Sequence, residues 1–232
     1  MIFSTMKRID AVTKNIKPLF SKAYSNANEI LVSSEVISTF PFCPKKLVKE
    51  QTPIVCRSFS KALSYGLDIR DLGSESAIIT QLQGKNIIFY NDNKPETHIA
   101  YSIIHELGHY INGHNMQISD EETYHRYEIE TNYFAAQILM PEQIIREFQR
   151  RGIAITVPFI QKNFSVSQQA AEKRISTLAK TTYDWKSRAE KEFDDIILLK
   201  YSDFINTVAP LKNNAYDLEY EYEKQEERNN WY

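Results

Sequence analysis

The segment Ile103–His109, which reads IIHELGH, constrains this chain more than any other, because it places two histidines four residues apart. On an α-helix, residues with this spacing project from one face, one turn above the other. Two neutral imidazoles so placed can bind one Zn²⁺ ion, and Glu106 would lie beside the open coordination position where water binds. Zinc lowers the pKa of that water towards about 7, and a neighbouring carboxylate can accept its proton. The HExxH pattern therefore predicts a zinc-dependent hydrolytic site with His105 and His109 as ligands and Glu106 as general base.

A third protein ligand is expected from the next helix. The segment 119–139 opens with the capping signal Ser-Asp-Glu-Glu and is periodic up to the proline that follows it. Within it, Glu128 and Asn132 lie four residues apart on one face. A carboxylate at 128 can complete a His₂Glu site, and the Asn132 amide can support the outer nitrogen of a ligating imidazole. Glu130 is the alternative ligand, but it lies about 200° around the helix from Glu128 and has no polar partner four residues on.

Two more histidines lie close to these residues in the sequence. His125 precedes Glu128 by about one turn and could stabilise a developing oxyanion, the alternative being an exposed surface histidine. His114 comes one residue too early to supply the third histidine of an extended HExxHxxGxxH pattern, which would require it at position 115. We therefore expect His114 near the C-terminal end of the motif helix, where the helix dipole favours it, and not on the metal.

The surrounding pattern predicts a mixed α+β fold. Residues 76–91 contain two isoleucine-rich runs on either side of Gln-Gly-Lys, which is typical of a β-hairpin. The motif helix should begin near Pro95 and end at Gly113. Gly108 lowers helix propensity by about 1 kcal/mol, so we expect it to permit close packing beside the ligands. The fold class predicted is a small, mostly antiparallel sheet packed on the HExxH helix and followed by a helical C-terminal part.

Helices are predicted on both sides of this core, and they divide the chain into four parts. The parts are an N-terminal helical segment (1–41), a catalytic core with the HExxH motif (42–141), a helix-turn-helix-like subdomain (142–180) and an amphipathic helix with an acidic, tyrosine-rich tail (181–232). The individual helices are expected at about 5–24, from Pro44, from Thr52 to Gly66, at 142–151, in two pieces over 156–180, and as one long helix over 184–208.

Composition excludes several other classes of protein. The 28 basic and 30 acidic residues give a net charge of −2, so nothing attracts the whole chain to nucleic acid or to anionic membrane. The chain lacks both a signal-peptide run and the roughly 20 apolar residues of a membrane span, which predicts a cytoplasmic protein. Cys43 and Cys56 form no CxxC pair and are expected to be reduced. The second helix of 156–180 carries few basic residues, so we favour packing over DNA contact there.

Three stretches together resemble the ImmA/IrrE family of zinc metallopeptidases: THIAYSIIHELGHYINGH, EIETNYFAAQILMP and FSVSQQAAEKRISTL. The similarity covers roughly residues 42–180, and the pairing of the first two stretches is its most specific part. The resemblance implies that His105, His109 and Glu128 bind zinc and that Glu106 is the catalytic base, in agreement with the spacing argument.

The chain departs from the family pattern at two places, and the family suggests a substrate. Thr131 stands where an alanine is usual, and residues 98–100 replace an Arg-Phe pair ahead of the motif helix. Family members typically occur in mobile elements, phages or stress operons, and the characterised activity is cleavage of a helix-turn-helix repressor. We expect a zinc endopeptidase whose partner is such a repressor. The alternative is a non-proteolytic anti-repressor or toxin-like binding module, and a weaker one is nucleic-acid binding by residues 156–180.

Overall fold

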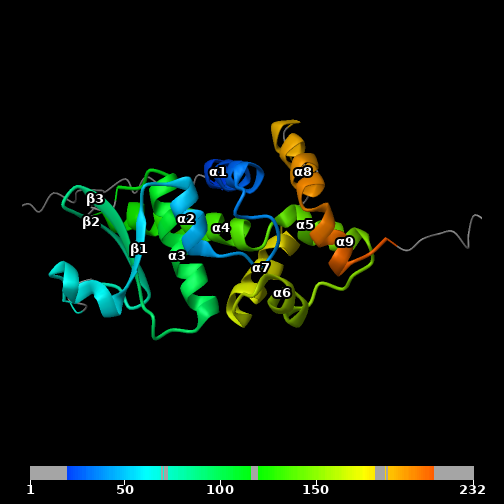
Figure 1. Ribbon diagram of the computed structural model, residues 1–232. Coiled ribbons are helices and arrows are strands. Elements are labelled where there is room, and N and C mark those ends of the chain that lie inside the picture. Colours follow the sequence, from blue (N-terminus) through cyan, green and yellow to red (C-terminus); the bar gives the residue numbers. More distant parts are fainter. Residues whose placement is uncertain are drawn as a thin grey trace, which may run out of the picture.

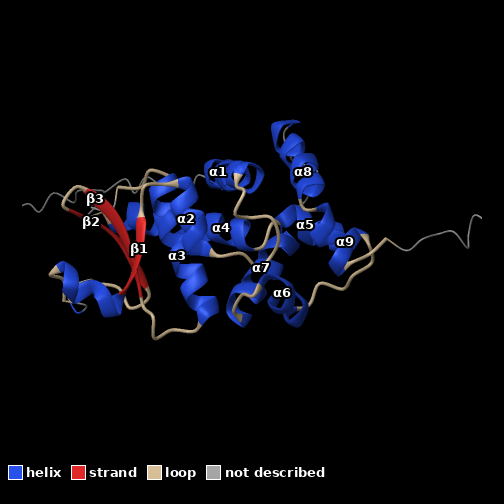
Figure 2. Ribbon diagram, in the orientation of Figure 1, coloured by secondary structure: helices blue, strands red, loops and turns tan. Residues whose placement is uncertain are grey.

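The computed structural model describes residues 20–68, 70, 73–115, 120–180, 186 and 188–211. A small sheet lies at one end of an elongated molecule, and most of the remainder is helical (Figure 1; Figure 2). In chain order the elements are α1 (Phe20–Ser33), α2 (Pro44–Gln51), β1 (Val55–Ser58), the 3₁₀ helix η1 (Phe59–Tyr65), β2 (Ala77–Leu82), β3 (Lys85–Tyr90), α3 (Glu96–Ile111), α4 (Glu121–Leu139), α5 (Glu142–Arg150), α6 (Val157–Phe164), α7 (Gln168–Lys180), α8 (Arg188–Lys200) and α9 (Ser202–Val208).

The sheet has the strand order β1-β3-β2. The predicted hairpin is confirmed, because β2 and β3 pair antiparallel around a two-residue turn. Gln83 and Gly84 form that turn with φ of 49° and 76°, and a positive φ at both positions matches the right-handed twist of a hairpin. β1 adds to the other side of β3 in parallel, so the sheet is mixed.

The two faces of the sheet pack against different elements. Ile79 and Ile88 form a pair on the face that joins the main core around α3. Ile78 and Phe89 lie on the opposite face, where Phe59 of η1 covers them in a small separate cluster. The sheet is therefore held between the motif helix and η1, which fixes the position of β2 beside that helix.

The motif helix α3 ends as the sequence predicts, at a glycine that follows its C-cap. Gly113 has a φ of +70° and terminates the helix in the left-handed conformation. The prediction for Gly108 is also confirmed. A Cβ atom at this position would lie 2.8 Å from Cδ1 of Phe134 and 2.9 Å from Cγ2 of Thr131, both on α4. The two helices that supply the predicted ligands thus touch at a point that only glycine allows.

The predicted helix from Thr52 to Gly66 is wrong in its first half. Thr52 caps the end of α2, where its hydroxyl donates to the carbonyl of Val48, and the chain then enters β1. Its second half is helical, but as the 3₁₀ helix η1, which ends at Gly66 with a φ of 76°. The pairing of β1 with β3 is a contact across more than 30 residues that local sequence does not encode.

The single helix predicted over 184–208 is two helices, α8 and α9, separated at Tyr201. Tyr201 is fully buried, and its hydroxyl donates to the carbonyl of Leu31 at the end of α1. The neighbouring Lys200 ammonium donates to the carbonyls of Leu31, Val32 and Ser34. The break therefore lies where the chain docks on the last turn of α1.

The remaining predicted helices are confirmed as α5, α6 and α7, and their start signals are those expected. α5 begins directly after Pro141 and is followed by Gly152 with a φ of 81°, while the Thr156 side chain caps α6. One hydrophobic core joins helices from α1 to α9 around the central α4 (Figure 1). The predicted end of the first helix near residue 24 is wrong, because α1 continues to Ser33 with Ala27, Ile30 and Leu31 buried. The part of that predicted helix before Phe20, Ser119 and the tail 212–232 lie outside the described residues. In the described ranges no helix has the length and apolar character that crossing a bilayer requires.

Candidate metal centre

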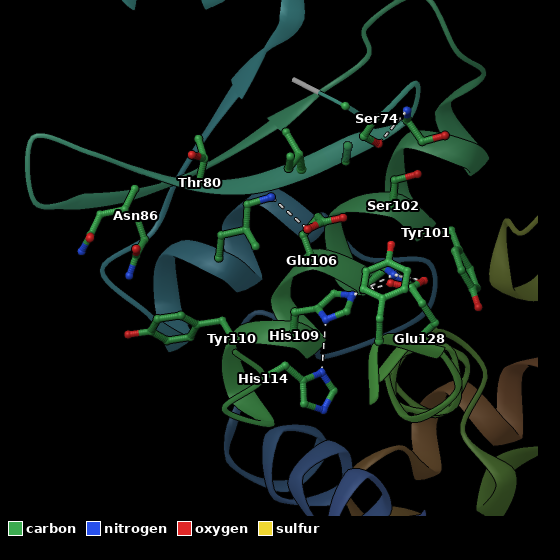
Figure 3. A pocket seen from close by; sticks show the side chains of 18 of the residues that line it. Ser74, Thr80, Asn86, Tyr101, Ser102, Glu106, His109, Tyr110, His114 and Glu128 are labelled. Atoms are coloured by element: carbon green, nitrogen blue, oxygen red, sulfur yellow. Dashed lines mark hydrogen bonds and ion pairs between the residues drawn. The ribbon is translucent and has the colours of Figure 1, made fainter. Parts of the chain in front are cut away.

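Three side chains from two helices converge beside the sheet. His105 and His109 project from one face of α3, and Glu128 reaches them from α4. Figure 3 shows His109 and Glu128 side by side. The Nε2 atoms of the two histidines are 3.2 Å apart. One carboxylate oxygen of Glu128 lies 3.3 Å from Nε2 of His105, and the other lies 3.2 Å from Nε2 of His109. The structure thus brings together the three residues that the sequence predicts as ligands.

These separations fit a bound metal ion. Zinc–ligand bonds of about 2.0–2.1 Å at tetrahedral angles place two donor atoms about 3.3–3.4 Å apart. The three observed distances of 3.2–3.3 Å agree with this value. Among the residues that the structure describes, no second group of three His, Cys, Asp or Glu side chains converges in this way. The His-His-Glu group can therefore hold a metal ion.

The charge state of Glu128 also suits a ligand. Burial acts to raise its pKa, but hydrogen bonds and charge from His105 and His109 outweigh burial and hold the pKa well below its usual range. The carboxylate is therefore ionised and available to a cation. Glu130, the alternative ligand, is directed away from the two histidines into a buried contact of its own.

That contact is with His114, which the turn at the end of α3 folds back over His109. The His114 N–H donates to the His109 carbonyl, and the Gly113 N–H donates to the carbonyl of Tyr110, which is the Schellman arrangement of a helix C-terminus. As a result Nδ1 of His114 lies 3.1 Å from Nδ1 of His109, and Nε2 of His114 lies 3.0 Å from Glu130. The ring also stacks on Tyr127 with the centroids 4.0 Å apart.

This contact favours one tautomer of His109. Burial lowers the pKa of His114 to about 4 in spite of Glu130, so the ring is neutral at pH 7 and carries one N–H. When that N–H donates to Glu130, the other nitrogen of His114 accepts a hydrogen bond from Nδ1–H of His109. The Nε2 lone pair of His109 then points at the metal position, as expected of an imidazole held by an outer partner.

Asn132 does not contribute the support that its spacing predicts. Its amide oxygen accepts a hydrogen bond of 3.0 Å from the hydroxyl of Tyr101, and the outer nitrogen of His109 faces His114 instead. The sequence signal for His114 was the glycine before it: a left-handed residue at 113 reverses the chain and returns the next side chain to the helix.

The proposed general base contacts both the site and the sheet. Glu106 is buried, and its Oε2 accepts a hydrogen bond of 2.9 Å from the backbone N–H of Ile79 in β2 (Figure 3). Burial raises the pKa of Glu106, although the neighbouring His105 and His109 act to lower it. A carboxylate with a raised pKa is a better proton acceptor than an exposed one.

A cavity of about 890 Å³ lies in front of these groups, between β2 and α3. Glu106, His109 and Glu128 line it (Figure 3). Tyr124, which precedes Glu128 by one turn of α4, lines it as well. Burial, the charge of Glu128 and a hydrogen bond to the Glu128 carboxylate raise the pKa of Tyr124, so its hydroxyl keeps its proton. His125 is exposed and does not line the cavity. His125 was the predicted oxyanion donor, but the residue of α4 that lines the cavity one turn before Glu128 is Tyr124. Sequence analysis missed Tyr124 because a tyrosine on a helix belongs to no specific motif.

Two histidines of an HExxH motif and a glutamate from the following helix are the donor set of one class of metallopeptidases. A comparison with protein families matches residues 54–176 to the IrrE N-terminal-like domain. Because the match covers more than half of the 232 residues, the chain belongs to the ImmA/IrrE family of metallopeptidases. A comparison with curated proteins finds no match.

Proposed function

We propose that the protein is a zinc-dependent endopeptidase that acts in the cytoplasm on a protein regulator, namely a helix-turn-helix repressor of a mobile element, phage or stress operon. The observation that carries the proposal is the convergence of three side chains, with the two imidazole Nε2 atoms 3.2 Å apart and each within 3.2–3.3 Å of one Glu128 carboxylate oxygen, next to a cavity large enough for a peptide. Membership of a metallopeptidase family supports peptide hydrolysis as the reaction. The free thiols of Cys43 and Cys56 suit a reducing compartment.

In this proposal each part of the site has one task. His105, His109 and Glu128 would hold the zinc ion, which when bound polarises a carbonyl and lowers the pKa of water to about 7. Glu106 accepts the proton of the attacking water and delivers it to the leaving amine. Tyr124 lines the same cavity, and in the presence of substrate its hydroxyl would exchange Glu128 for the oxyanion that forms on the substrate carbonyl.

The test uses the substitution Glu106→Gln, which preserves size and hydrogen bonding but removes the proton acceptor. The matched control is Glu96→Gln, the same change at an exposed position in the first turn of α3. Each variant is co-expressed with a helix-turn-helix repressor, chosen from the genes that neighbour this one, and repressor length and reporter output are both read. Zinc content is measured on the purified proteins.

We expect about one zinc per chain in all three proteins and cleavage that falls by about 10²–10⁴-fold in Glu106→Gln alone. The alternative function, an anti-repressor or toxin-like module that acts by binding, predicts a different pattern. It requires full derepression by Glu106→Gln while the repressor stays intact on a gel. That result would overturn the enzymatic proposal even if zinc is bound.

A further inference from the structure

A second cavity lies between α4 and α7, and among the described residues Tyr101 is the only one that it shares with the cavity of the metal site. Its volume is about 300 Å³, at the lower end of the roughly 300–1,000 Å³ found for small-molecule sites. Most of its wall is apolar or aromatic and consists of Phe20, Ile129, Tyr133, Ala136, Met140 and Ala170. An apolar cavity with a few placed polar groups is the usual form of a small-molecule site.

The wall of this cavity also contains a buried cation, Arg174 of α7. Its side chain is 2 % exposed, and no carboxylate in the described part of the chain forms an ion pair with it. Glu142 is charged and near enough to act on the pKa of Arg174, but it pairs with Arg146 at 2.7 Å. Burial lowers the pKa of Arg174, yet a guanidinium keeps its proton. A buried charge without an opposite partner is unfavourable, so the cavity wall favours an anion.

The hydrogen bonds of Arg174 leave one of its nitrogens free. Nε donates to the carbonyl of Met140 at 2.9 Å, and Nη2 donates to the side-chain oxygen of Gln137. Nη1 is buried and has no hydrogen-bond partner among the described residues. Buried donors are nearly always paired in proteins, because an unpaired one loses its bonds to water without replacement. The two N–H groups of Nη1 therefore remain available to an acceptor.

We propose that this cavity binds a small organic monocarboxylate with an aromatic or branched aliphatic body. The carboxylate accepts hydrogen bonds from Nη1 of Arg174, and the exposed Lys173, which also lines the cavity, adds a second positive charge. The body of the ligand packs against the apolar wall. The inference does not depend on the proposed peptidase function, because none of the residues of this cavity is a proposed metal ligand or general base.

The charges and the volume select this class of ligand over others. A neutral ligand would leave the guanidinium without an opposite charge. A phosphate monoester carries up to two negative charges and three acceptor oxygens, more than one free guanidinium nitrogen and one lysine can match. A volume of about 300 Å³ restricts the body to one ring or a short branched chain.

The position of this cavity relates it to the metal site. Ile129, which lines it, directly follows Glu128 on α4. Tyr101 borders both cavities, and its hydroxyl donates to the side-chain oxygen of Asn132 at 3.0 Å. A bound carboxylate would therefore contact the helix that carries Glu128 and a wall of the catalytic cavity, which is a placement suited to an effector.

Three probes separate the contribution of the charge from that of the body. They are 3-phenylpropanoate, its neutral analogue 3-phenylpropanamide, and acetate, which has the charge without the body. Ligand-observed NMR titration of the full chain gives their dissociation constants. We expect about 1 mM or lower for 3-phenylpropanoate, binding at least about 10-fold weaker for the amide, and no saturation by acetate. Removal of zinc with a chelator should leave these values unchanged, because this carboxylate does not bind the metal.

Substitutions in α7 test the location. Ala170→Leu places a larger side chain in the cavity without a large change in helix propensity, and Ala179→Leu makes the same change at an exposed position of the same helix that does not line the cavity. Ala170→Leu should weaken 3-phenylpropanoate at least about 10-fold, and Ala179→Leu should bind it as the wild type does.

Arg174→Met tests the charge, because it keeps an unbranched side chain and removes the guanidinium. It should abolish the preference for the acid over the amide, with folding checked by circular dichroism. If this variant does not fold, the acid-to-amide ratio of the wild type and the two alanine substitutions decide the question. Equal affinities for acid and amide, unchanged binding by Ala170→Leu, or loss of binding when zinc is removed would each overturn the inference.

Discussion

The substitution Gly108→Ala tests whether contact between α3 and α4 sets the geometry of the metal site. The added Cβ would lie 2.8 Å from Cδ1 of Phe134, and ordinary contact begins at 3.4 Å, so the helices must separate by at least about 0.6 Å (3.4 − 2.8). Overpacking of this kind costs about 1–3 kcal/mol, and the better helix propensity of alanine offsets about 1 kcal/mol of it. The net loss in the free energy of unfolding should therefore be about 0–2 kcal/mol.

The effect on metal binding should be larger than the effect on stability. The two histidine ligands are on α3 and Glu128 is on α4, so a separation of the helices pulls the donor set apart. Metal sites tolerate errors of only about 0.2 Å in ligand distance. We expect zinc affinity to fall by at least about 10-fold, measured by competition with a chromophoric chelator, alongside urea unfolding of the metal-free protein.

Phe134→Leu provides the internal control, because it removes the ring atom that the new Cβ meets. Combined with Gly108→Ala, it should recover part of the zinc affinity, and the double-mutant cycle should show coupling between the two positions. The reasoning fails if Gly108→Ala raises the free energy of unfolding by the full 1 kcal/mol of helix propensity and binds zinc as the wild type does. That result would mean that the two helices do not meet at Gly108 in solution.

Three further predictions concern the ligands and their surroundings. Glu128→Ala should abolish measurable zinc binding in equilibrium dialysis, whereas Glu130→Ala should weaken it only about 10-fold through His114; equal losses would refute the choice of ligand. His114→Ala should lower zinc affinity about 10–100-fold, and an unchanged affinity would show that the ligating imidazole needs no outer partner. Glu147→Gln should reduce the free energy of unfolding by about 1 kcal/mol at pH 7, because bonds from Arg150, and then Arg151, lower the folded pKa of Glu147 against the opposing effect of burial. Because the pKa of Glu147 is lower in the folded state, its ionised carboxylate stabilises the protein at pH values above the unfolded pKa of 4.5, and this stabilisation is lost as the pH falls through the folded pKa. The difference in the free energy of unfolding between Glu147→Gln and wild type, measured with urea, should therefore shrink from pH 5 to pH 3. A constant difference would contradict the mechanism.

The parts of the fold that sequence analysis predicted are those fixed by local chemistry. The C-terminal end of α3, the start of α4 at Asp120 and the hairpin turn each depend on a capping residue or on a glycine or its turn neighbour at positive φ. Gly108 was informative for the same reason, since a glycine inside a helix is unfavourable unless something packs against it.

The errors arose where a distant partner decides the local structure. Residues 55–58 form a strand only because β3 lies beside them, and α8 stops at Tyr201 because the end of α1 accepts its hydroxyl. In the metal site, too, local spacing was predictable and contacts made by a chain reversal were not. Helical spacing brought His105, His109 and Glu128 together, but the outer contact of His109 depends on a turn that returns His114 to the helix. Spacing on one helix also could not tell that Tyr124, not His125, borders the cavity.

The capping of α1 by Lys200 has a consequence for synthesis. The Lys200 ammonium donates a hydrogen bond to the carbonyl of Leu31, which lies 169 positions earlier in the chain. This end of α1 therefore stays uncapped by Lys200 until almost the whole described chain has been made. At about 5–20 residues per second, a ribosome needs roughly 10–30 s to cover that interval. During this time the helix leaves the tunnel with one end and part of its apolar face bare. The nascent protein thus passes through a period in which its first described helix is a ready target for chaperones, and the arrival of α8 ends that period.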